Sequence, residues 1–341
     1  MKSLIAKLFG HKKKKLPIDL NQCQSVLLKP IGTAVGDTIV HLAHLRQLKK
    51  AFPHIKIGVL VTPRCEALYK ASQIVDTLLT DKAPSYLSER KKWDLYLDFL
   101  PSFTSKSIIL DALLAPKWVI NFGKRAKKHY NLQTVENYDE SVQVPDRTHF
   151  KDYLNYTSFA KALNPEVCYE LPHFSLDSEK SYWQNNNRVK ILLNPQGSTR
   201  ALPALELNQL LENIDTSHCE LLMTNTQDSE AYFSQLTPME NLALAPKTNL
   251  FEYFALIDSA DIVVSVDGGG VHIACAYQKK LLCFYANDQK NIAKWYPVTN
   301  NALCVLVNQH DHNDKTEGFD IETAVTWLNQ EIANSSKNLT A

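Results

Sequence analysis

One stretch near the end of the chain, residues 260–276, constrains the fold more than any other. It reads ADIVVSVDGGGVHIACA, so an apolar run from Ile262 to Val266 stops at Asp267 and three glycines, and apolar residues then resume at helical spacing. The pattern predicts a buried strand, a tight turn and a helix. The glycines at 268–270 leave the first helical turn without side chains, so its N–H groups are open to an anion such as phosphate. An ordinary strand-to-helix junction capped by Asp267 is the alternative interpretation.

The length of the chain and its alternation of strand-like and helical segments predict two α/β domains. The 341 residues exceed the usual size of one hydrophobic core, so two domains of about 150 residues are expected. Apolar runs alternate with helical segments, which indicates a doubly wound parallel sheet in each domain and a ligand cleft at the carboxyl ends of the strands. The expected parts are a basic amphipathic N-terminal segment (1–20), a first Rossmann-like domain (21–165), a linker (166–187) and a second Rossmann-like domain (188–341).

The expected strands cover residues 26–28, 55–61, 77–79, 95–99 and 118–121 in the first domain, and 189–193, 220–223, 242–244, 262–266 and 281–285 in the second. Residues 123–150 are expected to be irregular. A helix around Tyr153–Leu163 is expected to close the first domain.

Composition indicates an ordinary soluble protein. Hydrophobic residues make up 45% and charged residues 21%, and the net charge of +1 gives no overall field to attract nucleic acid. Seven cysteines occur singly, without the short spacing of zinc ligands, which favours reduced thiols in a cytoplasmic protein. No apolar run reaches the ~18–20 residues that span a bilayer, and no signal peptide is visible. We therefore expect a chain that is neither exported nor integral to the membrane.

The first fifteen residues combine an apolar helical face with a basic run. Leu4, Ile5, Leu8 and Phe9 share one face, and HKKKK follows at residues 11–15. This is the composition of an interfacial anchor attracted to anionic lipid. A frayed, solvated basic tail is the alternative.

A carboxylate stands near the start of the first expected long helix. The first strand is followed by KPIGTAVGD, in which Gly32 and Gly36 make a flexible turn and Asp37 arrives where the helix begins. A carboxylate there is able to accept a proton from a bound hydroxyl. It also suits a plain helix cap. The glycine spacing matches neither a dinucleotide fingerprint nor a Walker loop.

The second domain opens with a similar loop, NPQGSTR, at residues 194–200. Its glycine, two hydroxyls and guanidinium suit phosphate oxygens, although ordinary turns also choose Gly and Ser. We expect this loop and the Asp267 turn to lie at the same sheet edge. His272, one turn into its helix, is able to donate to a phosphate, with a structural role as the alternative.

Basic residues cluster in the first domain, and they are either an anion-binding patch or solvated surface. The cluster comprises Lys124, Arg125, Lys127, Lys128 and His129, beside Arg64 and Arg147. No metal or nucleophile motif is visible. The nearest approach to one, His310–Asp314, is interpreted as a solvated turn.

The order of these motifs resembles glycosyltransferase family 9, the heptosyltransferases of lipopolysaccharide core synthesis. The resemblance covers about residues 25–330. Its motifs are Gly36-Asp37 through Phe52-Pro53, Val61-Thr-Pro-Arg64, Ile74-Val-Asp76, Asn194-Pro-Gln-Gly-Ser-Thr199 and the stretch from Asp261 to Ala274.

The resemblance implies a GT-B fold and a metal-independent transferase, without a cofactor, that inverts the anomeric centre. It implies Asp37 as general base and a donor, most readily ADP-heptose, held by two loops: Gly197, Ser198, Thr199 and Arg200, and Asp267, Gly268, Gly269, Gly270 and His272. The implied acceptor is the anionic lipid A–Kdo inner core at the cytoplasmic surface of the inner membrane, bound by Gly36, Arg64, Lys124, Arg125, Lys127 and Lys128.

Three positions depart from the family pattern. Asp267-Gly-Gly stands where members commonly carry Asp-Thr-Gly, Arg200-Ala-Leu-Pro203 replaces a lysine before Trp-Pro, and Ala286-Asn287 replaces Gly-Pro. These departures leave another nucleotide-hexose donor open. A nucleotide-sugar epimerase and a catalytically inactive nucleotide-sugar-binding protein are the alternatives from other classes.

Overall fold

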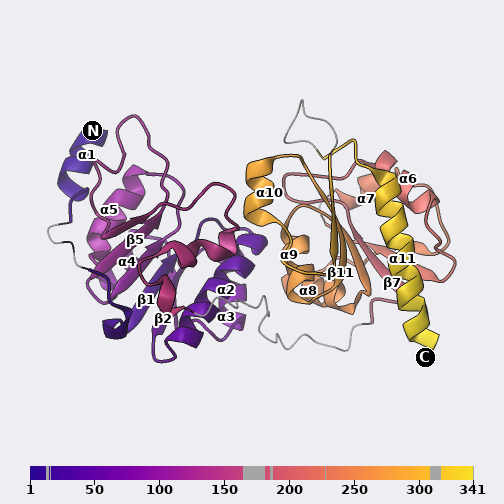
Figure 1. Ribbon diagram of the computed structural model, residues 1–341, viewed down its shortest axis with the longest axis horizontal. Coiled ribbons are helices and arrows are strands. Elements are labelled where there is room, and N and C mark those ends of the chain that lie inside the picture. Colours follow the sequence, from indigo (N-terminus) through magenta and orange to yellow (C-terminus); the bar gives the residue numbers. More distant parts are fainter. Residues whose placement is uncertain are drawn as a thin grey trace. The chain divides into compact units, whose positions relative to one another are not determined.

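The structure is a computed structural model that describes residues 1–12, 15, 17–163, 181–184, 187–226, 228–307 and 316–340. The chain divides into two compact units, Met1–Cys168 and Tyr169–Ala341 (Figure 1). Most of the expected linker and the whole of His310–Asp314 lie outside the described residues.

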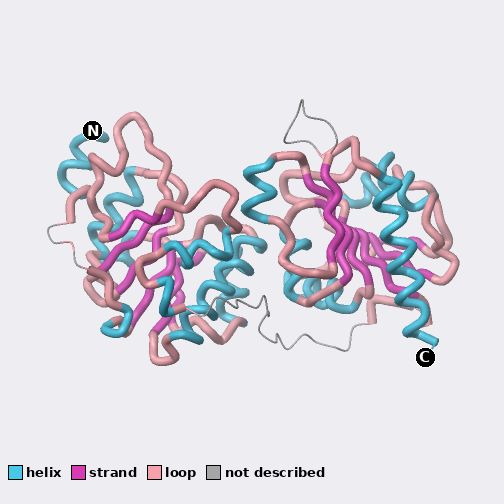
Figure 2. Tube along the Cα trace, in the orientation of Figure 1, coloured by secondary structure: helices cyan, strands magenta, loops and turns pink. Residues whose placement is uncertain are grey.

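The first unit is a six-stranded parallel sheet covered by helices (Figure 2). The strands run in the order β3-β2-β1-β4-β5-β6. The elements are α1 (Lys2–Phe9), η1 (Leu20–Gln22), β1 (Ser25–Lys29), α2 (Val35–Ala51), β2 (Lys56–Val61), α3 (Pro63–Ala71), β3 (Thr77–Thr80), α4 (Ala83–Ser88), β4 (Leu95–Asp98), α5 (Ser105–Leu114), β5 (Trp118–Phe122), β6 (Glu140–Val142), η2 (Phe150–Tyr156) and η3 (Ala160–Ala162).

Two expectations for the first unit are wrong. The helix around Tyr153–Leu163 is replaced by the short 3₁₀ segments η2 and η3, because Thr157 has an extended backbone and its hydroxyl donates to the Leu154 carbonyl at 2.7 Å. The stretch expected to be irregular contains β6, which completes the sheet where Asn121 donates to Ser141 at 2.7 Å.

The N-terminal helix packs on the first unit. α1 lies against α5, with Ala6 buried and Ile5 and Phe9 partly buried against the core. The Asn137 amide donates to the Phe9 carbonyl at 2.8 Å, so the helix end is also tied down. The frayed-tail alternative is therefore wrong for α1. Leu4 and Leu8 remain 56% and 65% exposed.

The second unit repeats the same architecture, with strands in the order β9-β8-β7-β10-β11-β12, all parallel. Its elements are β7 (Val189–Asn194), α6 (Ala204–Glu212), β8 (Cys219–Met223), α7 (Ser229–Phe233), β9 (Leu242–Leu244), α8 (Leu250–Ser259), β10 (Ile262–Val266), α9 (Gly269–Ala276), β11 (Lys280–Tyr285), α10 (Gln289–Trp295), β12 (Ala302–Leu306) and α11 (Ile321–Thr340). Every residue of β10 is buried, as expected for a central strand covered on both faces.

Each sheet reverses its strand order beside its first strand, between β1 and β4 in one unit and between β7 and β10 in the other. The loops that follow such neighbouring strands leave toward opposite faces. In doubly wound sheets the resulting crevice is where ligands bind. Of the helices that the structure describes, none is long and apolar enough to cross a bilayer.

Candidate active site

Two loops meet at the carboxyl edge of the second sheet. One follows β7 and the other follows β10, its direct neighbour. A Cβ atom placed on Gly197 would lie 3.1 Å from the Asp267 carbonyl oxygen, and one on Gly268 would lie 3.9 Å from the Gly197 Cα. The structure therefore brings together the two loops that the sequence singled out.

The loop after β7 is a tight turn with its hydroxyls at the tip. The Gly197 N–H donates to the Arg200 carbonyl at 2.7 Å, and Gln196 and Ala201 form a bridge below it. Ser198 and Thr199, between these anchors, are both exposed. Their hydroxyls are accessible to a ligand at this sheet edge.

Asn194 fixes the base of both loops. Its buried amide donates to Ser265 Oγ at 2.9 Å and accepts from Thr224 Oγ1 at 3.0 Å. These bonds join β7 and β10 to the end of β8, where the loops leave the sheet. A buried amide with both groups paired stabilises one arrangement of this edge.

Asp267 is paired with a cation and does not cap the helix. α9 begins at Gly269 with Gly268 as its N-cap, and no side chain caps it. The Asp267 carboxylate instead accepts from the Arg200 guanidinium and from the Asn291 amide, the latter at 2.8 Å. Burial raises the pKa of Asp267, and the charge of Arg200 opposes this rise. The helix-cap interpretation of Asp267 is therefore wrong.

Gly270 and His272 lie on the inner side of α9. A Cβ atom on Gly270 would overlap with the Asn194 amide nitrogen and lie 2.8 Å from the Tyr253 hydroxyl. This glycine lets the helix approach the sheet closely. His272 is 4% exposed, with its ring edge-on to Trp295 at 5.8 Å between centroids.

In the first unit, Asp37 stabilises the start of α2. The helix begins at Val35, two residues earlier than expected, because Asp37 Oδ2 accepts from the Ala34 N–H at 3.3 Å. Gly32 lies so close that a Cβ atom there would overlap with this oxygen. Gly36 is buried and Asp37 half-buried. The carboxylate stands in the first helical turn, where the dipole favours negative charge.

The basic cluster of the first unit is only partly a surface patch. Arg64, Arg125, Lys127 and Lys128 are exposed. Lys124 is not: its side chain has no exposed area, and its ammonium pairs with Asp98 at 2.6 Å. The prediction that Lys124 joins an exposed patch is wrong, because its charge is neutralised inside the unit.

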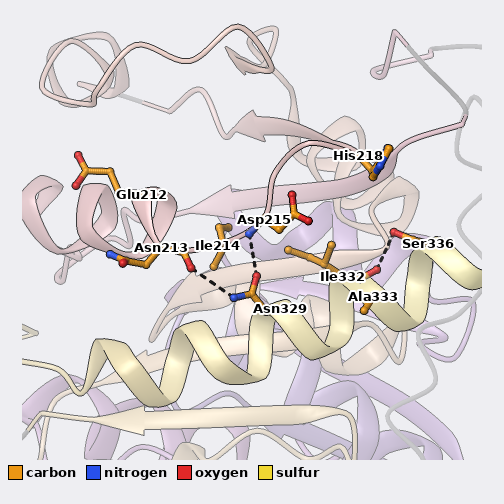
Figure 3. Close-up of a pocket in the computed structure, with 9 residues that line it drawn as sticks. All are labelled: Glu212, Asn213, Ile214, Asp215, His218, Asn329, Ile332, Ala333 and Ser336. Carbon is orange, nitrogen blue, oxygen red and sulfur yellow. Dashed lines mark hydrogen bonds between the residues drawn. The ribbon is translucent and has the colours of Figure 1, made fainter.

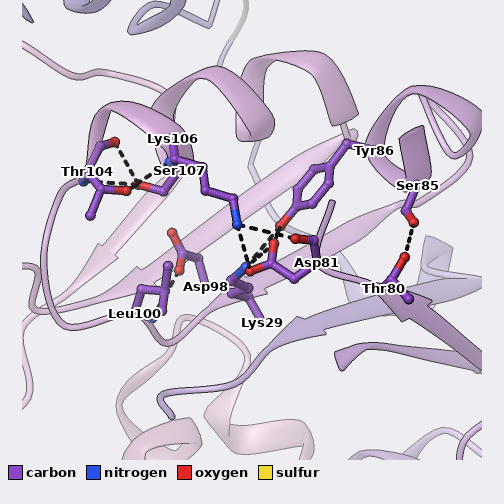
Figure 4. A network of polar contacts seen from close by, with 10 residues as sticks. All are labelled: Lys29, Thr80, Asp81, Ser85, Tyr86, Asp98, Leu100, Thr104, Lys106 and Ser107. Atoms are coloured by element: carbon purple, nitrogen blue, oxygen red, sulfur yellow. Dashed lines mark hydrogen bonds and ion pairs between the residues drawn. The ribbon is translucent and has the colours of Figure 1, made fainter. Parts of the chain in front are cut away.

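A second ionic group that the sequence did not reveal lies at the carboxyl ends of β1 and β3. The Lys29 ammonium is 2.6 Å from Asp81, and the Tyr86 hydroxyl donates to the same carboxylate at 2.9 Å (Figure 4). Lys106, from α5, reaches Asp81 at 3.5 Å. This network fixes the end of the strand that leads into the Asp37 loop.

A cavity of about 730 Å³ in the second unit lies away from these loops (Figure 3). It is bounded by Asp215 and His218, which precede β8, and by Asn329 of α11, whose amide oxygen accepts from the Asp215 N–H at 2.9 Å. It therefore opens at the amino end of a strand. Ligands of doubly wound sheets bind at the carboxyl ends, so we do not assign it to the site.

Comparison with known proteins decides the family. The family model for glycosyltransferase family 9 (heptosyltransferase) matches residues 119–324, more than half of the chain. The chain belongs to this family. The matched range includes both loops of the second unit and begins after Asp37. No curated protein sequence matches the chain.

Solved structures of the family share the fold. The E. coli ADP-heptose lipopolysaccharide heptosyltransferase II has a TM-score of 0.70 and 14% identity, over 91% of this chain and 99% of that one. A family 9 glycosyltransferase from Veillonella parvula has a TM-score of 0.72 and 12% identity, over 94% and 100%. E. coli heptosyltransferase WaaC with ADP has a TM-score of 0.65 and 13% identity, over 92% and 99%. This family 9 glycosyltransferase therefore has the GT-B fold.

Proposed function

We propose that this glycosyltransferase moves L-glycero-D-manno-heptose from ADP-heptose onto the Kdo/heptose inner core of lipopolysaccharide or lipooligosaccharide. The observation that carries the proposal is the meeting of the Gly197 and Gly268 loops at the carboxyl edge of β7 and β10. Exposed hydroxyls and an uncapped helix N-terminus suit a diphosphate at this place. Two family 9 structures that share the fold are described with ADP and with an ADP-heptose analogue.

Each group has a role in the proposed reaction. The acceptor oxygen attacks the anomeric carbon, the bond to the diphosphate breaks with its electron pair on ADP, and the configuration inverts. Asp37 takes the proton of the acceptor hydroxyl. Ser198, Thr199 and the N–H groups of residues 268–270 stabilise the charge that develops on ADP without a metal, with His272 and the Arg200–Asp267 pair supporting the loops.

The acceptor and the membrane belong to the first unit in this proposal. Arg64, Arg125, Lys127 and Lys128 are exposed cations that suit a phosphorylated core. Exposed Leu4 and Leu8 of α1, with Lys2 and Lys7 on the same short helix, suit the anionic cytoplasmic surface of the inner membrane. We propose a cytoplasmic enzyme that is peripheral on that membrane.

Transfer assays test the proposal. The full chain is incubated with Kdo-lipid A and ADP-heptose, UDP-hexoses or GDP-hexoses, with and without a chelator, and the product is identified by mass and by its anomeric coupling. We expect heptose transfer with inversion that survives the chelator. Transfer only from another nucleotide-hexose would replace the donor, and nucleotide binding without transfer would favour the inactive binding protein.

Asp37→Ala is the decisive variant. We expect it to abolish transfer while ADP still raises the melting temperature, since ligand binding stabilises the folded state. Unchanged turnover would remove Asp37 as the base.

A further inference from the structure

Two buried histidines lie next to the loop that leads to Asp37. His41 and His44, on α2, have no exposed area. The Ile31 N–H donates to His41 Nε2 at 2.9 Å, and the Nδ1 atoms of the two rings lie 3.4 Å apart. His44 Nε2 is 3.0 Å from the Phe150 carbonyl oxygen and 3.1 Å from that of Lys151.

These contacts fix the protons of both rings. His41 Nε2 accepts a hydrogen bond, so its proton is on Nδ1. That proton points to His44 Nδ1, which must then be the acceptor. The proton of His44 is therefore on Nε2, where it donates to the carbonyls of η2. All four ring nitrogens are satisfied only with both imidazoles neutral and in this order.

Aromatic packing holds the pair in place. Phe99, directly after β4, stacks on His44 with centroids 5.2 Å apart and planes 8° apart. Its ring is also edge-on to His41 at 4.8 Å, and Phe150 is edge-on to both imidazoles. The rings are thus held from β4 and η2 as well as from their own helix.

The histidine pair contacts, through Ile31, the loop that surrounds the Asp37 carboxylate. Ile31 precedes Gly32, where a Cβ atom would overlap with Asp37 Oδ2, and the same oxygen accepts from the Ala34 N–H. The loop of residues 30–34 is therefore held at Ala34 by Asp37 and at Ile31 by His41. His41 follows Asp37 by four residues, one helical turn further into α2.

We propose that His41 is a positioning residue for transfer: as a neutral acceptor oriented by His44, it fixes the loop of residues 30–34 and with it the Asp37 carboxylate. The inference rests on the proposed role of Asp37 as base. Loss of the acceptor lets the loop move, and small displacements of a reacting group strongly lower the rate of the chemical step.

The first test is spectroscopic and needs no substrate. In ¹⁵N-labelled full-length protein at pH 7.5, long-range ¹H–¹⁵N spectra report which ring nitrogen carries the proton. We expect Nδ1–H for His41 and Nε2–H for His44. An Nε2–H tautomer for His41 would overturn the proposal.

The second test compares two variants of His41. His41→Gln keeps an acceptor near the Nε2 position, and His41→Phe keeps the aromatic packing without one. With ADP-heptose and Kdo-lipid A we expect His41→Phe to lower kcat by at least about tenfold with the donor KM unchanged, and His41→Gln to recover most of kcat. Equal kcat for wild type and His41→Phe would overturn the proposal.

Controls separate this inference from a loss of stability and from the proposed function. Leu45 is a buried residue of the same helix that is not part of the His41–His44 pair, so Leu45→Ala should lower stability without lowering kcat at 20 °C. If Asp37→Ala is active, the proposed base is wrong. If Asp37→Ala is inactive while His41→Phe is as active as wild type, only the positioning role is wrong. If His41→Phe does not fold, the tautomers and His41→Gln still decide.

Discussion

The Arg200 guanidinium donates to the Asp267 carboxylate, and this pair joins the loop after β7 to the loop after β10. Arg200 lies in the turn that the Gln196–Ala201 bridge closes, and Asp267 directly follows β10, so the pair sets the spacing of the two loops. The charge of Arg200 is therefore partly neutralised by Asp267, and the attraction of Arg200 for a diphosphate depends on the charge that Asp267 retains.

Breaking this pair should weaken donor binding. Arg200→Met leaves a buried carboxylate that keeps the Asn291 amide as a donor but loses its cation, so we expect at least about tenfold weaker ADP binding by calorimetry and a lower melting temperature. Arg188→Met, at the amino end of β7, is the matched control and should change neither. Equal ADP affinity for Arg200→Met and wild type would contradict the proposed donor site.

The close approach of α9 to its sheet predicts a stability effect at Gly270. Gly270→Ala adds a methyl group that overlaps with the Asn194 amide, and overpacking of this kind costs about 1–3 kcal/mol in the free energy of unfolding. Gly269→Ala, at the first position of the same helix, should cost nothing, because alanine favours helices. Urea unfolding of both variants measures the difference, and an equal effect would show that Gly270 is not packed as described.

Lys124 should matter for stability more than its exposed neighbours do. Lys124→Met leaves Asp98 charged and buried, which costs about 3–5 kcal/mol in the free energy of unfolding. Lys127→Met, three positions further on at the surface, should stay within about 0.5 kcal/mol of wild type. Equal urea midpoints for the two variants would contradict the buried pair.

The buried imidazoles predict a specific acid sensitivity. Burial lowers the pKa of His44 to about 4, against about 6.5 in the unfolded chain. The unfolded state therefore binds a proton first as the pH falls. The stability that neutral His44 provides is complete above pH 6.5 and declines toward pH 4, by up to about 3 kcal/mol.

The comparison that isolates this effect uses His44→Gln, which cannot titrate. The difference in unfolding free energy between wild type and His44→Gln should shrink between pH 7 and pH 4.5. A difference that stays constant with pH would mean that folding does not lower the pKa of His44.

The exposed leucines of α1 should bind lipid without supporting the fold. We expect Leu4→Ser with Leu8→Ser to abolish co-sedimentation with phosphatidylglycerol vesicles and to leave the melting temperature unchanged. Leu205→Ser, which alters a 69% exposed leucine of the second unit, is the control. Added salt should also weaken wild-type binding, because Lys2 and Lys7 act through a screened charge.

The sequence predicted the regular elements well where the spacing of apolar residues follows one clear pattern. The bounds of β9 and β10 agree with the structure to the residue, because each has a clear apolar pattern and a polar boundary. The 3₁₀ segments η2 and η3 were missed, because the side-chain bond that ends a helical turn at Thr157 leaves the apolar pattern unchanged.

Pairings between distant segments could not be predicted from one sequence. The burial of Lys124, in the loop after β5, depends on Asp98 at the end of β4, and Asn291 reaches Asp267 from α10. The His41–His44 contact was visible only as two histidines three residues apart on a helix, and its meaning depends on Ile31 and Phe150. The meeting of the Gly197 and Gly268 loops was predicted because neighbouring parallel strands bring their carboxyl ends to one edge.

Each unit completes its own sheet: the described strands β1 to β6 pair among themselves, and so do β7 to β12. Heating should therefore melt the protein in two calorimetric steps, each with its own enthalpy. A nucleotide held by the loops of the second unit would move one of these steps upward and leave the other where it was, so a single scan would report which half of the chain had found its ligand.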